Sequence, residues 1–153
     1  MNQVYWDTSA LLKIYVVERD SEFFLDLIEK ADRPVCTSVI STVEIRCALS
    51  RKKQAGDIDR IDEAKAMNRF TADCMKGRIT QLSCNDDTAT RAKDLVDLAR
   101  GKQRPIMIRS LNALHLASAM SARAPAIVTT DMRMREVAAL LRLKLIPGTY
   151  STK

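Results

Sequence analysis

The sequence predicts an α/β fold in which a central, mostly parallel sheet of four to five strands lies between two layers of helices. Short runs of apolar and β-branched residues recur along the 153-residue chain, and amphipathic helical segments separate them. Parallel strands need long crossover connections, and helices supply them. In such sheets the ligand site lies beyond the carboxyl ends of the strands, so functional residues are expected at that edge.

The first half of the sequence contains three strand candidates with helical segments between them. The strands are expected at 4–6, 35–37 and 79–84, and the helices at 10–17, 21–31, 39–53 and from about 58 to 76. Asp7-Thr8-Ser9 opens the first helix, and Asp32-Arg33-Pro34 ends the second. Gly56 breaks the helical pattern before the fourth helix. Residues 79–84 alternate between apolar and polar, as a half-buried strand does.

The second half continues the alternation. Helices are expected from about 85 to 101 and at 111–122 and 132–142, and strands at 126–128 and 143–146. Asn85 can cap the first of these helices, and Ser110 starts the second. No repeat or linker interrupts the chain, whose length suits one core, so 1–153 is interpreted as a single domain.

The composition excludes several classes of protein. Hydrophobic residues make up 46% and charged residues 29% of the chain, as in an ordinary globular protein. The four cysteines form no C-x-x-C pair and only one histidine accompanies them, which argues against zinc. No secretory signal or membrane-spanning apolar run is visible, so we expect free thiols and a cytoplasmic location, with no membrane partner. The net charge of +6 fits a polyanionic partner, and it fits a merely basic protein about equally well.

Three acidic residues follow predicted strands. Asp7 comes directly after the first strand, Glu44 lies on the helix after the second, and Asp131 follows the strand at 126–128. Each has a structural alternative, since Asp7 and Asp131 suit helix N-caps and Ser41–Glu44 matches the capping box S-x-x-E.

The three acids together favour a metal site. The parallel topology brings them to one edge, and Glu44 shares a helical face with apolar residues, where an unpaired carboxylate is costly. Clustered carboxylates resist ionisation unless a cation neutralises them. Because the site offers oxygen ligands, we expect Mg²⁺ or Mn²⁺. Such a site suits phosphodiester hydrolysis.

Four segments in this order and spacing make the sequence resemble the PIN-domain family, and within it the VapC-like toxins of type II toxin–antitoxin systems. They are Tyr5–Lys13, Ser41–Ile45, Ser110–Ala117 and Val128–Arg133. The resemblance implies a PIN-like three-layer α/β/α sandwich and a Mg²⁺- or Mn²⁺-dependent endoribonuclease that a cognate antitoxin inhibits. Related toxins commonly form homodimers and cut structured RNA. It also implies that residues 58–75 form part of an arm or groove for the antitoxin.

The resemblance assigns roles by position. The metal-binding and catalytic positions are Asp7, Glu44, Asn112 and Asp131. The hydroxyls that would orient these ligands, or would merely start helices, belong to Thr8, Ser9 and Thr130. Eight basic residues near the motifs are candidates to hold phosphate groups: Lys13, Arg46, Arg51, Lys52, Lys53, Arg109, Arg133 and Arg135. Of these we select Arg46, Arg133 and Lys13.

Asn112 departs from the family pattern, which has an acid before Ala-Leu-His. An amide oxygen can still bind a metal, but it brings no negative charge, so metal affinity and activity should be low or absent. Natural divergence and an engineered replacement both remain open, and the intact flanking motif slightly favours the second. A PIN module that binds RNA or a protein without cutting is the main alternative. A phosphatase with Asp7 as nucleophile is weaker, because Ser9 stands where such an enzyme has a second aspartate.

His115 lies one helical turn after Asn112 and is a candidate general base. We prefer a histidine that packs or forms hydrogen bonds beside the core.

Overall fold

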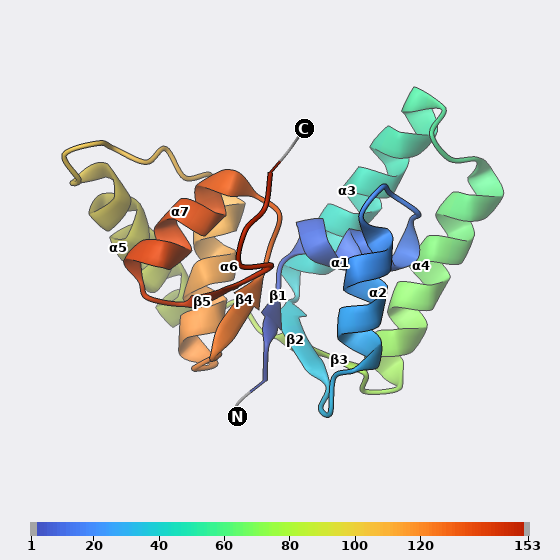
Figure 1. Ribbon diagram of the computed structural model, residues 1–153, viewed down its shortest axis with the longest axis horizontal. Coiled ribbons are helices and arrows are strands. Elements are labelled where there is room, and N and C mark those ends of the chain that lie inside the picture. The colour runs from blue at the N-terminus through green and yellow to red at the C-terminus, as the bar shows by residue number, and fades with distance from the viewer. Residues whose placement is uncertain (1–2, 152–153) are drawn as a thin grey trace.

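The computed structural model describes residues 3–151, within which five parallel strands form one sheet in the order β3-β2-β1-β4-β5 (Figure 1). The strands are β1 (Tyr5–Trp6), β2 (Val35–Ser38), β3 (Ile79–Leu82), β4 (Ala126–Val128) and β5 (Lys144–Ile146). The prediction of a central parallel sheet is confirmed.

Helices cover both faces of this sheet, as Figure 1 shows. They are α1 (Thr8–Tyr15), α2 (Ser21–Glu29), α3 (Ile40–Ala55), α4 (Arg60–Met75), α5 (Asp86–Arg100), α6 (Ser110–Ser121) and α7 (Met132–Leu140). Neighbouring strand residues point to opposite faces. Trp6 and Val128 therefore pack with α1–α4, whereas Tyr5 and Ile127 pack with α5–α7. The sandwich has a separate hydrophobic cluster on each face.

The order of the strands reverses between β1 and β4. The chain builds outward from β1 to β2 and β3, and it then returns to place β4 on the other side of β1. The backbone N–H of Asp7 extends this pairing by donating to the Val128 carbonyl at 3.1 Å. A crevice forms at such a switch point beyond the strand ends, where the helices that follow the strands diverge.

Two of the three acids, Asp7 and Asp131, are N-caps of helices, whereas Glu44 is not part of a cap. Asp7 caps α1 by accepting from the Ala10 N–H at 3.1 Å, and Asp131 caps α7 by accepting from the Met134 N–H at 2.9 Å. The capping box that was the structural alternative for Ser41–Glu44 does not form. Helix α3 begins at Ile40 with no side-chain cap, so Glu44 lies inside the helix and is free to face the cavity described below.

Asn85 does form a capping box at the start of α5. Its side chain accepts from the Thr88 N–H at 3.0 Å, while the Thr88 hydroxyl accepts from the Asn85 N–H at 3.5 Å. Asn85→Ala should therefore lower the free energy of unfolding by about 1 kcal/mol, measured by urea denaturation. Asn68→Ala, at an exposed site within α4, is the control and should be neutral or slightly stabilising. Equal losses in the two variants would contradict the capping role.

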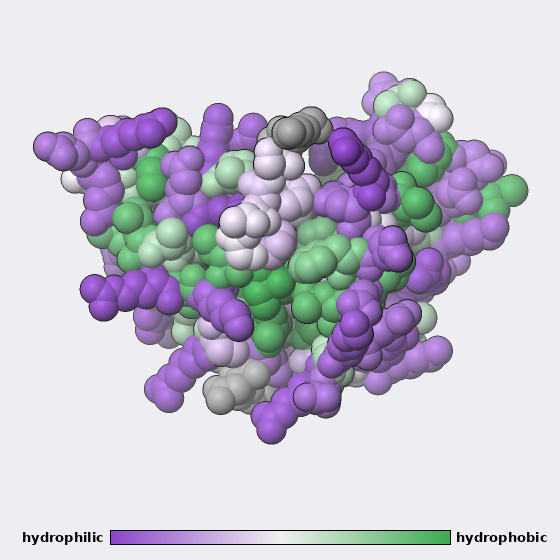
Figure 2. All heavy atoms as spheres, in the orientation of Figure 1, coloured by the Kyte–Doolittle hydropathy of each residue, from purple (hydrophilic) through white to green (hydrophobic). Residues whose placement is uncertain are grey.

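The outer surface is mostly polar. In the orientation of Figure 2, hydrophobic residues gather over the centre of the molecule and hydrophilic residues lie on both flanks. Among residues 3–151, no helix is both long and apolar enough to span a membrane. The four cysteines carry free thiols, as expected.

Candidate functional site

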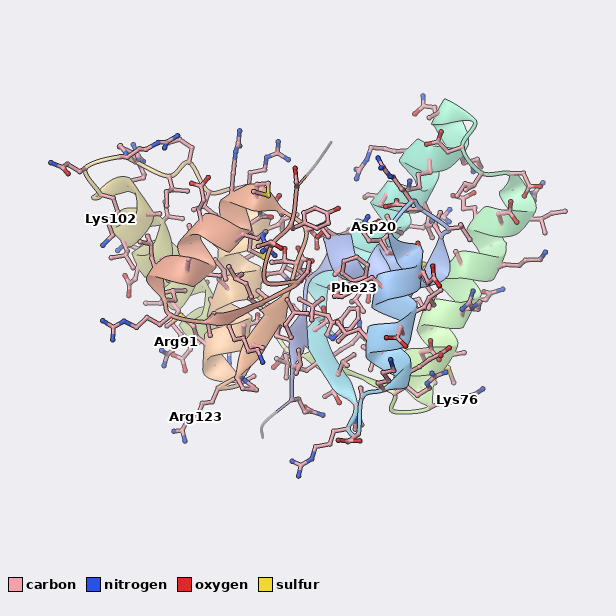
Figure 3. All side chains as sticks on the ribbon, in the orientation of Figure 1. Asp20, Phe23, Lys76, Arg91, Lys102 and Arg123 are labelled. Atoms are coloured by element: carbon pink, nitrogen blue, oxygen red, sulfur yellow. The ribbon has the colours of Figure 1, made fainter. Side chains whose placement is uncertain are left out.

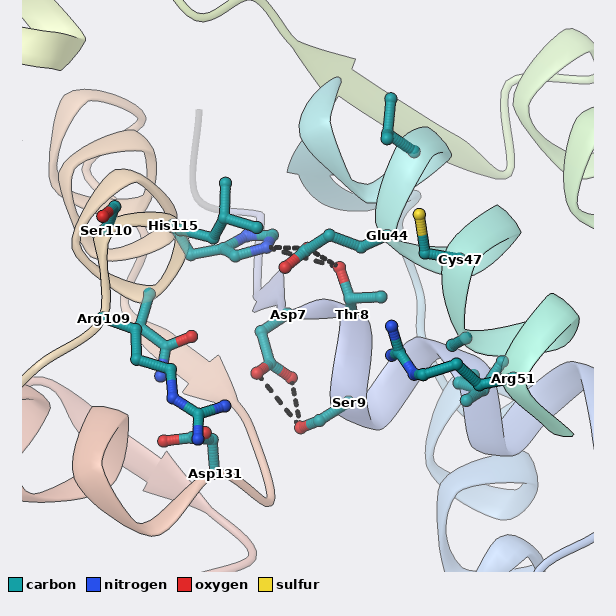
Figure 4. A pocket seen from close by; sticks show the side chains of 15 residues that line it. Asp7, Thr8, Ser9, Glu44, Cys47, Arg51, Arg109, Ser110, His115 and Asp131 are labelled. Carbon is teal, nitrogen blue, oxygen red and sulfur yellow. Dashed lines mark hydrogen bonds and ion pairs between the residues drawn. The ribbon is translucent and has the colours of Figure 1, made fainter. Parts of the chain in front are cut away.

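A cavity of about 630 Å³ lies at the carboxyl edge of β1 and β4. Four of the side chains that line it are those that the sequence predicted to meet: Asp7, Glu44, Asn112 and Asp131. Figure 4 labels the three acids. They come from four different elements or their caps, which the parallel topology brings to one edge. The predicted hydroxyl residues Thr8 and Ser9 also line the cavity, whereas Thr130 lies behind Ser9 and donates to its hydroxyl at 2.9 Å.

Asp7 is the most deeply buried of these acids, with 3% of its surface exposed. Its carboxylate accepts hydrogen bonds from Ser9 at 2.8 and 3.0 Å and from Thr129 at 2.9 Å, besides the Ala10 N–H. Burial nevertheless raises the pKa of Asp7 above its usual value, because the desolvation outweighs these bonds. A bound cation would favour the charged form of this carboxylate.

Thr129 connects Asp7 to Asp131. Its hydroxyl donates to Asp7 and accepts from the backbone N–H of Asp131 at 3.1 Å. The two acids are thereby held in a fixed relation by one buried side chain. Thr129 was not among the predicted site residues, although it precedes Thr130 within the matched segment 128–133. Its place at the carboxyl end of a buried strand was the available signal.

Glu44 accepts hydrogen bonds from Thr8 and, at 2.6 Å, from His115. Burial alone would raise the pKa of Glu44, but the hydrogen bonds from His115 and Thr8 outweigh it and hold that pKa below its usual value. His115 is itself buried and hydrogen-bonded, the arrangement that the sequence analysis preferred for it.

These residues fit a hard divalent cation. The donors are carboxylate, hydroxyl and amide oxygens, which Mg²⁺ and Mn²⁺ prefer. In the part of the chain that the structure describes, no three His, Cys, Asp or Glu side chains are close enough to bind one ion alone. Mg²⁺ commonly keeps several waters and uses one or two carboxylates, which Asp7 and Asp131 can supply.

The side-chain amide of Asn112 places a nitrogen donor at this position of the site. Its side-chain nitrogen is buried and has no hydrogen-bond partner within residues 3–151. An unpaired buried donor is destabilising, and a carboxylate at this position would present an oxygen instead. The surroundings of Asn112 therefore suit a carboxylate, which has two oxygens, better than an amide, in which one oxygen is replaced by an N–H₂ donor.

Two arginines, Arg51 and Arg109, line the cavity, and Figure 4 shows them on opposite sides of Asp7. Both were among the eight basic candidates, but the selected residues were others. Arg51 lies seven residues after Glu44, so helical periodicity places it on the same face of α3. Arg109 lies three residues before Asn112, at the N-cap of α6.

The three selected residues lie elsewhere. Lys13 is buried, forms ion pairs with Glu18 at 2.7 Å and Asp20 at 2.6 Å, and does not line the cavity. Arg46 pairs with Glu63 at 3.1 Å, and Arg133 is exposed on α7; neither lines the cavity.

The net charge of +6 is not concentrated at the cavity. The basic side chains labelled in Figure 3 point outward from widely separated places: Lys76, Arg91, Lys102 and Arg123. The electrostatic signal for an anionic ligand is local and comes from the two cavity arginines.

Comparison with known proteins agrees with this arrangement. The family model of the PIN domain matches residues 4–140. No curated protein sequence matches. Solved structures share the fold at low identity. The structure of Mycobacterium tuberculosis VapC20, described as a sarcin–ricin loop cleaving toxin, has a TM-score of 0.68 and 15% identity, covering 88% of this chain and 94% of that one.

Two further structures are toxin–antitoxin assemblies. VapBC2 from Rickettsia felis, bound to a fragment of its promoter DNA, has a TM-score of 0.61 and 16% identity, with 93% of this chain and 96% of that one covered. A toxin–antitoxin complex from Klebsiella pneumoniae has a TM-score of 0.59 and 16% identity, with 84% and 87% covered. At these identities the likeness concerns the fold.

Proposed function

Because this chain belongs to the PIN-domain family, we propose that it is a metal-dependent endoribonuclease, the toxin of a toxin–antitoxin pair, and that Asn112 weakens or abolishes its activity. One observation carries the proposal. A buried carboxylate, Asp7, lies beside Asp131 at the strand edge, in a cavity that two arginines also line.

The polar residues in and beside the cavity have three kinds of role in this proposal: metal binding, orientation of a metal ligand, and phosphate binding. Asp7 and Asp131 would hold Mg²⁺ or Mn²⁺, with Glu44 and the amide oxygen of Asn112 as further oxygen donors. Such an ion activates water and stabilises negative charge on the phosphate. Ser9 and Thr129 orient the Asp7 carboxylate through hydrogen bonds. Arg51 and Arg109 would bind phosphate oxygens of the RNA.

The proposed partner is based on the solved structures that share the fold. Solved relatives include toxin–antitoxin complexes, which supports a cognate antitoxin protein as partner, with the α3–α4 region around residues 58–75 as its groove. We expect the chain to act as one domain, to form a homodimer and to work in the cytoplasm on RNA.

A PIN module that binds RNA without cutting it is the alternative, and Asn112 is the observation that favours it. The buried acids oppose it. A site with no cation to bind gains nothing from a carboxyl group that is buried where desolvation raises its pKa. Divalent-metal binding distinguishes the two functions, since a module that only binds RNA has no use for the ion.

The decisive test compares this chain with its Asn112→Asp form on structured RNA with Mg²⁺ or Mn²⁺, and with a chelator. Restoring the fourth acid should raise the cleavage rate at least about tenfold, because ligand-set changes in metal sites have effects of this size. Asp7→Ala in the Asn112→Asp background should remove the activity and so exclude a contaminating nuclease. If every form is folded but inert across varied RNAs, the binding module becomes the better assignment.

A further inference from the structure

A chain of hydrogen bonds runs beneath the cavity from Tyr5 on β1 through His115 on α6 to Glu44 on α3. The Tyr5 hydroxyl lies 2.7 Å from His115 Nδ1, and His115 Nε2 lies 2.6 Å from Glu44 Oε2. Tyr5 is fully buried and His115 is 1% exposed, and their rings meet edge to face. Figure 4 shows His115 and Thr8 both directed at the Glu44 carboxylate. These hydrogen bonds connect strand β1 with one helix from each face of the sheet, α6 and α3, and they end at Glu44.

We propose that His115, oriented by Tyr5, is a positioning residue that fixes the Glu44 carboxylate with one oxygen anchored in the protein and the other available to the cavity. The inference rests on the proposed function for the role of Glu44 and adds two residues to the site, one of which does not line the cavity.

The anchoring is specific to one oxygen of Glu44. Among the described residues, both hydrogen bonds that Glu44 accepts, from His115 and from Thr8, go to Oε2. The Thr8 hydroxyl, whose one hydrogen is directed at Glu44, also lies 3.1 Å from the Ser41 hydroxyl. Oε1 is therefore the oxygen that remains for a ligand in the cavity.

The hydrogen bonds also assign the protonation of the imidazole. A carboxylate only accepts, so Nε2 carries the hydrogen that points at Glu44. The Tyr5 hydroxyl contacts the other ring nitrogen, Nδ1, at 2.7 Å. Tyr5 therefore holds the ring in the orientation that directs Nε2 at Glu44.

Packing alone does not explain a histidine here. Apart from Ser118, its buried neighbours on α6 are apolar, namely Ala113, Leu116, Ala117 and Ala119, and a buried imidazole is destabilising unless its nitrogens are hydrogen-bonded. Both nitrogens are bonded, and one of the partners is a cavity carboxylate. An outer residue that orients a metal ligand typically changes metal affinity about 10- to 100-fold when it is removed.

The protonation of Nε2 can be read directly, because His115 is the only histidine of the chain. In a two-dimensional ¹H–¹⁵N spectrum of the ¹⁵N-labelled protein, we expect Nε2 to be of the protonated type. In Tyr5→Phe, Nε2 should stay protonated and the Nδ1 signal should shift, because Nδ1 has lost its hydrogen-bond partner. An unprotonated Nε2 in the unsubstituted protein would overturn the proposal. This measurement needs neither metal nor RNA.

Metal binding tests the consequence, with Mn²⁺ alone as the probe and calorimetry as the readout, in the Asn112→Asp background. His115→Leu and Tyr5→Phe should each weaken Mn²⁺ binding about tenfold or more. His115→Gln, whose amide nitrogen can replace Nε2, should restore most of the affinity. Tyr15→Phe is the matched control, because Tyr15 is also a buried tyrosine, bonded to Asp73 at 3.0 Å and outside the cavity lining.

The outcomes separate the two proposals. Unchanged Mn²⁺ affinity in His115→Leu would overturn the positioning role; if that variant does not fold, unchanged affinity in Tyr5→Phe would overturn it. Equal losses in Tyr5→Phe and Tyr15→Phe would also overturn it, because they would indicate general destabilisation. If RNA is never cut while the protonation of Nε2 and the Mn²⁺ pattern are as expected, the nuclease proposal fails and the positioning role stands. If no form binds Mn²⁺, the metal-dependent function fails and the protonation of Nε2 alone decides.

Discussion

Asp7→Asn should decrease metal-dependent RNA cleavage at least about 100-fold in the Asn112→Asp background, and it should stabilise the metal-free protein. The loss of activity follows from the position of Asp7, which is the most buried acid of the cavity and is joined to Asp131 through Thr129. Single-turnover cleavage of a structured RNA measures it.

The stabilisation follows from the raised pKa of Asp7. A folded-state pKa above the unfolded one means that the folded protein holds the proton more tightly. The stability associated with the protonated acid is fully present below the ordinary pKa of 3.8, and it is lost as the pH rises through the higher folded-state pKa. Asparagine imitates the protonated form, so the variant should unfold at a higher temperature than the parent at neutral pH. The difference in unfolding temperature between Asp7→Asn and its parent should become smaller at acidic pH, where Asp7 is protonated.

Saturating Mn²⁺ should narrow this difference, because only the parent can use the ion to neutralise Asp7. Asp57→Asn, which removes an exposed acid from the loop before α4, is the control and should change neither property. An Asp7→Asn variant that cuts at the parent's rate, or that is less stable at neutral pH without metal, would contradict the assignment of Asp7 as a desolvated metal ligand.

Replacing both cavity arginines should weaken RNA binding about 100-fold at low salt. The estimate follows from about tenfold for each charge-assisted hydrogen bond to phosphate. Arg51→Gln/Arg109→Gln should also lower the slope of log affinity against log salt concentration by about 1.4 to 1.8, the contribution of two neutralised phosphates. Fluorescence anisotropy with a labelled RNA hairpin, in chelator to prevent cleavage, gives both quantities.

The matched control is Arg46→Gln/Arg133→Gln, which removes the same charge from outside the cavity. It should reduce affinity much less. Similar losses in the two double variants would mean that general surface charge attracts the RNA, and that the cavity arginines have no special part in it.

The fold was predictable to a large extent because buried apolar runs and turn residues recur in order. The strand at 126–128 was predicted with the bounds that the structure shows, since all three of its residues are buried. The ends of elements were less predictable because tertiary contacts set them. β3 ends at Leu82, where its pairing with Ser38 of β2 ends, although the alternating pattern continues to Cys84. Helix α7 ends at Leu140, and Arg142 then takes a left-handed conformation, with φ of 56°, that no local pattern indicated.

The site was predictable where topology determined it. Asp7, Glu44, Asn112 and Asp131 meet because parallel strands place their carboxyl ends at one edge. The two arginines that line the cavity, Arg51 and Arg109, were not selected, because nearness in sequence to an acid was used in place of helical periodicity. Arg46 is two residues from Glu44 and points away, whereas Arg51, seven residues on, shares its cavity.

The pairing of β1 with both β2 and β4 sets the order in which a newly synthesised chain can become active. Asp7 and Glu44 are made early, but Asp131 follows β4, which comes late in the sequence. Until β4 has been synthesised, one edge of β1 is open, and such an edge invites pairing with other chains. Premature termination would therefore give a product that lacks the complete site and is prone to aggregate. For the nuclease proposed above, this arrangement would restrict activity to chains that have been translated beyond Asp131.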